Sequence, residues 1–147
     1  MGTNLTILVA EDSPDDALFF RLACNAAKQD HRLHFVADGK EAIDYLQGKG
    51  QFADRQSYPS PDLVVLDLKM PRVNGFQVLE WIRSRPELKG LNVVVLTGSI
   101  YPSDPPRAAE LGAKGFFVKS CWGEEFIQTI RDICRNFLRP SVVSHPA

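Results

Sequence analysis

Residues 61–75 read PDLVVLDLKMPRVNG, and this stretch indicates how the chain folds. The segment 62–67 is a short apolar run that ends in a carboxylate, Asp67. A continuous apolar run of this length, bounded by prolines, is typical of a strand that is buried on both faces of a parallel sheet. Apolar residues at helical spacing follow over 74–85. The stretch therefore predicts a strand, a polar turn and a helix.

The same alternation continues in both directions from this stretch. Buried strands are predicted at 5–10, 32–37, 62–67, 91–97 and 114–119. Helices are predicted from an N-cap at Ser13 to about residue 28, around Ala42, Ile43 and Leu46, over 74–85, weakly between Pro102 and Gly112, and over 124–138. Residues 48–61 form the longest expected loop. This order predicts an α/β fold with a parallel sheet that helices cover on both faces.

Composition and charge exclude several classes of protein. The chain has 147 residues, one domain's worth, and its 17 basic and 18 acidic residues give a net charge of -1. Nucleic-acid binding needs a basic surface, so we expect no nucleic-acid partner. The sequence has no apolar run of about 18 residues, so we expect no membrane span. The three cysteines, Cys24, Cys121 and Cys134, fit reduced thiols in a cytoplasmic protein.

Charged and hydroxyl side chains stand where four of the predicted strands end. Glu11 and Asp12 follow the first strand, Asp67 ends the third, Thr97 ends the fourth and Lys119 ends the fifth. The carboxyl ends of parallel strands form one rim, where ligands bind. Crowded carboxylates need a cation, and oxygen ligands favour Mg²⁺. A carboxylate nucleophile with a metal, an ammonium group and a hydroxyl suits phosphoryl transfer. Each residue also has a structural explanation, such as helix capping for Asp12.

Four segments carry a family resemblance: residues 9–14 (VAEDSP), 66–75 (LDLKMPRVNG), 96–98 (LTG) and 116–119 (FFVK). Together they resemble the receiver domains of two-component response regulators. The resemblance implies a flavodoxin-like (CheY-like) five-stranded parallel sheet in the order 2-1-3-4-5. It implies a receiver domain over residues 5–138, a flexible tail over 139–147 and no output domain. The loop at 55–61 is similar to that of single-domain regulators paired with bacterial phytochrome kinases.

The resemblance implies a role for each matching residue. Asp67 corresponds to the phosphoacceptor. Asp12 corresponds to the direct Mg²⁺ ligand, Glu11 to the ligand that acts mostly through water, and the backbone carbonyl of Lys69 to a third ligand from the protein. The switch residues and the phosphate-binding lysine correspond to Thr97, Phe116 and Lys119.

The sequence departs from the family pattern beside the site. Ser120 replaces the usual proline after Lys119, where the family often has a cis peptide; a cis bond here would cost about 3 kcal/mol, so a trans bond is expected. We expect the ammonium group of Lys69 to lie in solvent. Pro105 and Pro106, together with Pro102, are expected to prevent a regular start of the fourth helix.

The resemblance implies a sensor histidine kinase as partner, and the subfamily resemblance implies a phytochrome-like one. It would dock near the first helix, around Phe19, Phe20 and Leu22, with Phe20 either exposed or in the core. Apolar residues of the last helix would either support a homodimer or pack on the sheet: Trp122, Phe126, Ile127, Phe137 and Leu138. Two alternatives are a receiver-like binding module that is never phosphorylated and a haloacid-dehalogenase-like phosphohydrolase. Such enzymes carry a second aspartate where Lys69 stands.

Overall fold

The computed structural model describes residues 4–98, 101–119 and 123–140. The strands are β1 (Thr6–Ala10), β2 (Arg32–Val36), β3 (Leu63–Leu66), β4 (Val93–Thr97) and β5 (Gly115–Val118). The helices are α1 (Pro14–Ala26), α2 (Gly39–Gln47), α3 (Gly75–Arg83), α4 (Asp104–Glu110) and α5 (Glu124–Phe137). Two 3-10 turns, η1 (Gly50–Phe52) and η2 (Pro86–Leu88), precede β3 and β4.

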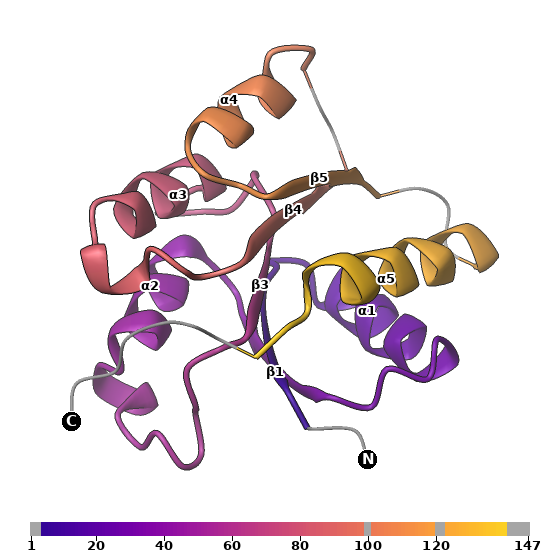
Figure 1. Ribbon diagram of the computed structural model, residues 1–147, viewed down its shortest axis with the longest axis horizontal. Coiled ribbons are helices and arrows are strands. Elements are labelled where there is room, and N and C mark those ends of the chain that lie inside the picture. Colours follow the sequence, from indigo (N-terminus) through magenta and orange to yellow (C-terminus); the bar gives the residue numbers. More distant parts are fainter. Residues whose placement is uncertain (1–3, 99–100, 120–122, 141–147) are drawn as a thin grey trace.

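The strands form one sheet in the order β2-β1-β3-β4-β5, and every neighbouring pair is parallel. Helices α2, α3 and α4 lie on one side of this sheet, and α1 and α5 lie on the other (Figure 1). The predicted fold class, strand order and layering are therefore confirmed. Among the described residues, no helix combines the length and the apolar character needed to span a membrane.

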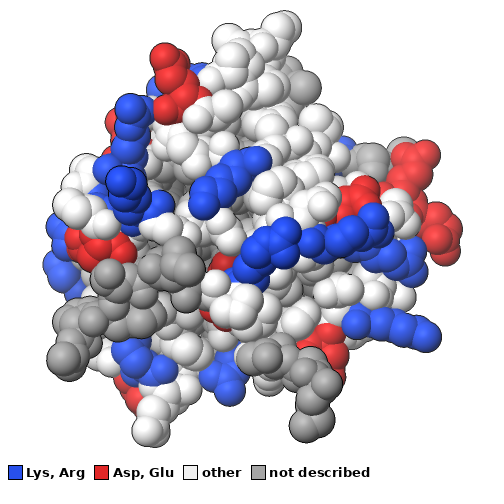
Figure 2. Space-filling model, in the orientation of Figure 1, with Lys and Arg blue, Asp and Glu red and all other residues white. Residues whose placement is uncertain are grey.

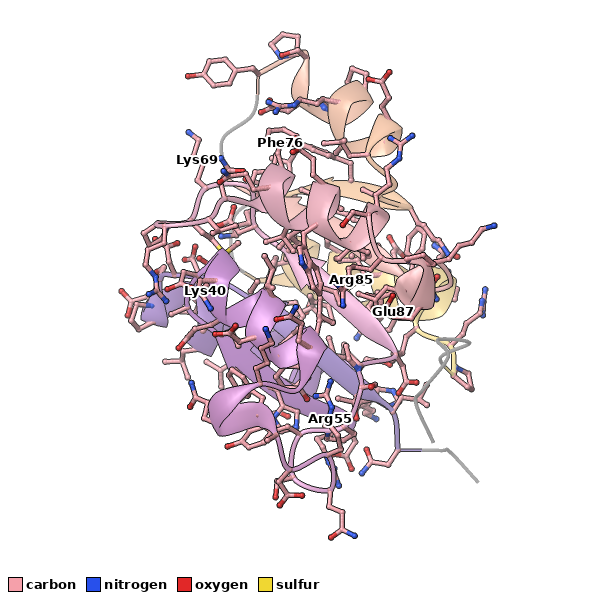
Figure 3. All side chains as sticks on the ribbon, turned by 90° about the vertical axis from the view of Figure 1, so that its left-hand side faces the viewer. Lys40, Arg55, Lys69, Phe76, Arg85 and Glu87 are labelled. Atoms are coloured by element: carbon pink, nitrogen blue, oxygen red, sulfur yellow. The ribbon has the colours of Figure 1, made fainter. Side chains whose placement is uncertain are left out.

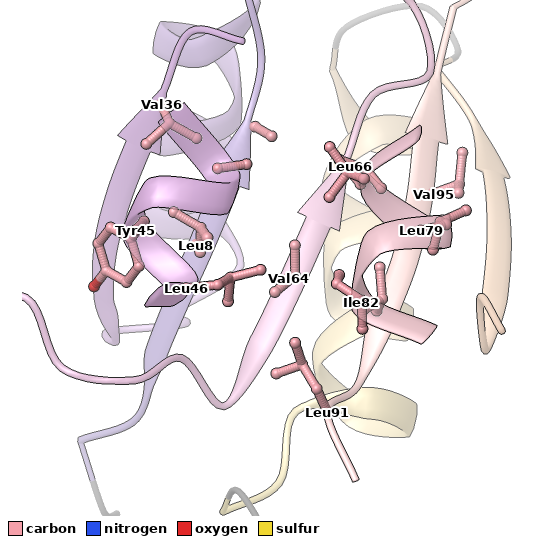
Figure 4. Close-up of a cluster of buried hydrophobic side chains, with 14 of the residues drawn as sticks. Leu8, Val36, Tyr45, Leu46, Val64, Leu66, Leu79, Ile82, Leu91 and Val95 are labelled. Atoms are coloured by element: carbon pink, nitrogen blue, oxygen red, sulfur yellow. The ribbon is translucent and has the colours of Figure 1, made fainter. Parts of the chain in front are cut away.

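The core consists of two apolar clusters, one on each face of the sheet. Val64 and Leu66 of β3 face the α2 and α3 side, which Figure 4 shows in close-up. Leu63 and Val65 point to the opposite cluster beneath α1 and α5. All four side chains are buried. Because successive strand residues point to opposite faces, a central strand must be apolar at every position.

Local capping explains where the helices begin. The hydroxyl of Ser13 accepts a hydrogen bond from the backbone N–H of Asp16 at 3.2 Å, so Ser13 is the predicted N-cap of α1. The expectation for α4 was wrong, because Pro105 and Pro106 lie inside its first turn. The first N–H groups of a helix have no partner within the helix, so prolines there cost no hydrogen bond.

Burial shows which apolar residues of α1 and α5 pack in the core and which are exposed. Phe20 is 4% exposed and belongs to the core, whereas Leu18 and Leu22 of α1 are each 52% exposed. In α5, the side chain of Phe126 is buried in the core. Of the other apolar residues considered for a homodimer, Leu138 is buried, Ile127 and Phe137 are half-buried, and Trp122 lies outside the described residues. Most of this apolar surface therefore packs on the sheet, and the homodimer stays a prediction.

The long connection before β3 packs against α2 and, through the ring of Tyr58 beside His34, against the edge strand β2. The hydroxyl of Tyr45 donates to the carbonyl of Pro59 at 2.8 Å. Arg55, labelled in Figure 3, donates to the carbonyls of Leu46 and Tyr58 at 3.0 Å each. These bonds close the loop over the aromatic rings on that side of the sheet and cover part of its edge.

Candidate functional site

Asp67 lies directly after β3, and polar partners occupy both oxygens of its carboxylate. Its side chain is 8% exposed. Oδ1 accepts hydrogen bonds from the hydroxyl of Thr97 at 2.9 Å and from the backbone N–H of Lys69 at 3.3 Å. Oδ2 faces the ammonium group of Lys119 at 3.2 Å. The structure therefore brings together Asp67, Thr97 and Lys119, which were predicted from three separate strand ends.

The parallel sheet positions these residues because its hydrogen-bond ladder continues one residue past the strands. The N–H of Asp67 donates to the carbonyl of Ala10 at 3.1 Å, and the N–H of Lys119 donates to the carbonyl of Thr97 at 2.8 Å. The backbone at each of these positions is therefore held by a neighbouring strand. A site built on rigid strand ends loses little entropy when it binds a ligand.

Three carboxylates form the acidic part of the site. One oxygen from each of Glu11, Asp12 and Asp67 lies within 4.8 Å of the other two. Glu11 is buried and Asp12 is exposed, so the cluster opens to solvent on the side of Asp12. Burial raises the pKa of Glu11 to about 7, although its hydrogen bond with Lys119 opposes this rise. An all-oxygen set with an open side fits a hard divalent cation such as Mg²⁺, which keeps several of its waters.

Lys119 balances this negative charge. Its ammonium group donates to Glu11, to Asp16 at 2.8 Å and to Asp67 at 3.2 Å. Burial lowers the pKa of Lys119, but the hydrogen bonds to Asp16 and Glu11 and the charge of Asp67 outweigh it and raise the pKa above its ordinary value. Lys119 is therefore a permanent cation. Asp16 also belongs to the site, although it lies beyond the end of the first strand and was not among the predicted site residues.

The loop between β3 and α3 wraps closely around Asp67. The N–H of Gly75 donates to the carbonyl of Leu68 at 3.0 Å. A Cβ at Gly75 would lie 2.4 Å from the carbonyl oxygen of Asp67, so only glycine fits this approach. The side chain of Lys69 is exposed and points away from the body of the protein, with its ammonium group 5.9 Å from the ring centroid of Tyr101 (Figure 3). As expected, it lies away from the carboxylates, and a metal-binding role of its carbonyl stays a prediction.

Two further predictions concern β5 and the residue after it. Phe116 is half-buried and packs against the core on the α4 side of the sheet. A conformational switch at this ring stays a prediction. Ser120 lies outside the described residues, and so does the conformation of its peptide bond with Lys119.

Comparisons with known proteins identify the family of the chain. The family model described as "Response regulator receiver domain" matches residues 7–131. The response regulator Rcp1 of Synechocystis is 35% identical over 114 residues, which cover 78% of this chain and 76% of Rcp1. The solved Mn²⁺-bound form of Rcp1 has a TM-score of 0.80 and 31% identity, and the match covers 97% of this chain and 99% of that one.

The phosphorylated cyanobacterial phytochrome response regulator RcpA is also similar in structure. Its TM-score is 0.84 at 30% identity, and the match covers 97% of this chain and 100% of RcpA. The fold and the family match agree. The chain therefore belongs to the response regulator receiver domain family, the signalling domains of two-component systems.

Proposed function

We propose that this protein is a response regulator that accepts a phosphoryl group on Asp67 and signals by protein–protein contact. One observation carries the proposal: the carboxylate of Asp67 faces the hydroxyl of Thr97 on one oxygen and the ammonium group of Lys119 on the other, beside two further carboxylates. The carboxylate of Asp67, the proposed nucleophile, thus has a hydroxyl donor and a positive charge beside it.

The chemistry follows from these contacts. One oxygen of Asp67 attacks phosphorus, the new P–O bond forms an acyl phosphate, and the P–N bond to a phosphohistidine breaks so that the imidazole leaves with its electron pair. The negative charge on the transferring oxygens is stabilised by Lys119 and by the hydroxyl of Thr97, both already held within hydrogen-bonding distance of Asp67. No acid or base is needed to activate the nucleophile, because a carboxylate can attack phosphorus directly.

Glu11, Asp12 and Asp67, together with the backbone carbonyl of Lys69, would hold the Mg²⁺ ion. When bound, Mg²⁺ supplies positive charge to the phosphoryl oxygens. Support comes from the short mutual distances of the three carboxylates and from their oxygen-only chemistry. The solved Mn²⁺-bound form of Rcp1, a similar protein, agrees with a divalent cation in this family.

The proposed phosphoryl donor is a sensor histidine kinase, and the similarity to RcpA and Rcp1 favours a phytochrome-like one. Leu18 and Leu22, each 52% exposed on α1, offer an apolar surface where such a kinase would dock. A cytoplasmic location fits this partnership. Figure 2 shows basic side chains across the middle of one face and acidic ones mostly towards its edges, and the net charge of -1 favours a protein over a nucleic-acid partner.

Incubation with acetyl phosphate and Mg²⁺, followed by intact-mass spectrometry, tests the proposal. We expect a labile gain of one phosphoryl group that is absent when Mg²⁺ is chelated and absent in Asp67→Asn. Asp62→Asn is a matched control, because Asp62 precedes the same strand and lies at its other end. No adduct on the native protein would favour a receiver-like module that is never phosphorylated. Steady turnover of small phosphate esters would favour a phosphohydrolase.

A further inference from the structure

The three carboxylates that accept hydrogen bonds from Lys119 differ in their other roles at the site. An ammonium group has three hydrogen-bond donors. In this protein Glu11, Asp16 and Asp67 accept one bond each from Lys119. Glu11 and Asp67 also belong to the acidic cluster with Asp12, whereas Asp16 is outside that cluster. Asp16 is thus the partner of Lys119 that has no other assignment at the site.

The capping of α1 explains why the carboxylate of Asp16 is available. Asp16 is the third residue of the helix, the position whose side chain in a capping box accepts from the backbone N–H of the N-cap residue. Here Glu11 takes that place, because its Oε2 accepts from the N–H of Ser13 at 3.1 Å. The backbone N–H of Asp16 donates to the hydroxyl of Ser13 at 3.2 Å, while its carboxylate turns to Lys119.

Helix α3 of the same protein shows the usual arrangement. Its third residue, Gln77, accepts from the N–H of the N-cap Asn74 at 2.9 Å, and Asn74 accepts from the N–H of Gln77 at 3.0 Å. The side-chain oxygen at this position is therefore used within the helix end. In α1 the carboxylate of Asp16 is available for Lys119, because Glu11 accepts from the N–H of the N-cap residue in its place.

We propose that Asp16 is a positioning residue that keeps the ammonium group of Lys119 directed at Asp67 throughout the phosphorylation cycle. The inference rests on the proposed function. During the cycle the carboxylate of Asp67 becomes an acyl phosphate, and Glu11 would help to hold the metal ion, so both would be weaker acceptors for Lys119. Asp16 is not modified in the cycle and keeps its contact, which ties the first turn of α1 to the residue that follows β5. The side chain of Lys119 is only 11% exposed, so a lost partner is not readily replaced by water.

The test measures phosphorylation and dephosphorylation of Asp16→Ala and Asp16→Asn with acetyl phosphate and Mg²⁺. We expect the phosphorylation rate to fall about tenfold in Asp16→Ala, the loss of one charge-assisted hydrogen bond, and less in Asp16→Asn, which keeps an acceptor. Asp16→Glu should recover part of the rate. Asp15→Asn, an exposed neighbour in the same turn of α1, should match the native protein.

A second measurement does not depend on phosphorylation. Denaturant unfolding without Mg²⁺ should show that Asp16→Asn lowers stability in the native background and has a much smaller effect in a Lys119→Met background. Equal effects in both backgrounds would overturn the contact. A native protein that is phosphorylated normally, with Asp16→Ala at the same rate, would overturn the positioning role alone. A native protein that is never phosphorylated would overturn the proposed function and this role together.

Discussion

Arg72 and Asp38 join the loop that follows β3 to the first turn of α2. Nε of Arg72 donates to Oδ2 of Asp38 at 3.0 Å, and Nη2 forms an ion pair with the same oxygen at 2.9 Å. The other oxygen of Asp38 accepts from the backbone N–H of Glu41 at 2.8 Å and so caps α2. Arg72 itself has a φ of 65°, in the left-handed region that favours glycine. The ion pair thus holds a strained residue five positions after Asp67.

Two substitutions of Arg72 distinguish how its side chain and its backbone conformation contribute to the stability of the fold. We expect Arg72→Ala to lower the free energy of unfolding by up to about 1 kcal/mol, because the guanidinium is exposed and the pair is partly screened. Arg72→Gly also loses the ion pair but relieves the backbone, so it should be more stable than Arg72→Ala by about 1 kcal/mol. Denaturant unfolding measures both. A glycine variant that is less stable than the alanine variant would contradict the assignment of strain.

Thr97 offers a test of the hydroxyl that faces Asp67. The side chain is fully buried, and its bond to Oδ1 measures 2.9 Å. Thr97→Val keeps the shape and removes the donor, so we expect phosphorylation by acetyl phosphate to slow about tenfold or more, the loss of one hydrogen bond to a charged group. Thr97→Ser keeps the donor and should stay close to the native rate. Mass spectrometry over time follows both variants. Equal rates for the valine and serine variants would show that the hydroxyl plays no part.

Removal of the ammonium group should make the fold depend on a metal ion. In Lys119→Met the carboxylates of Glu11, Asp16 and Asp67 lose their shared cation, which we expect to cost about 3 kcal/mol in the absence of Mg²⁺. Mg²⁺ should then raise the midpoint of thermal unfolding more in this variant than in the native protein, because the ion replaces part of the missing charge. Lys69→Met, which removes an exposed lysine near the site, is the control and should respond to Mg²⁺ as the native protein does. An identical response of all three proteins would argue against a cation at this cluster.

His34 predicts a dependence of stability on pH. Its Nε2 is buried without a hydrogen-bond partner, and its ring packs 5.6 Å from that of Tyr45 between centroids. Burial and the charge of Arg32 lower the pKa of His34 below 6.5, the ordinary value. As the pH falls through about 6.5, the unfolded chain takes up a proton that the folded protein does not, so the free energy of unfolding decreases. His34→Phe should remove this contribution. Denaturant unfolding at a series of pH values measures the difference, and parallel curves for the two proteins would refute it.

The sheet could be predicted from the sequence because each strand is marked by a short apolar run of neighbouring residues. The apolar run before Asp67 alone specifies a buried parallel strand, and the side chains at the strand ends follow from the topology. Asp16 could not be predicted in the same way, because its partner Lys119 is 103 residues away and the contact depends on how Glu11 takes over the helix cap. The burial of Phe20 was also undecided, since four consecutive apolar residues on α1, at 17–20, leave the orientation of the helix open.

The three filled donors of Lys119 have a consequence for how the protein would change state. A phosphoryl oxygen could gain this ammonium group only by displacing a carboxylate that already holds it. Activation would then be an exchange of partners within a nearly constant number of hydrogen bonds, and its net free energy would be a small difference between similar terms. Such a balance makes the two states readily interconvertible, so that a single group added to one side chain is enough to shift their populations.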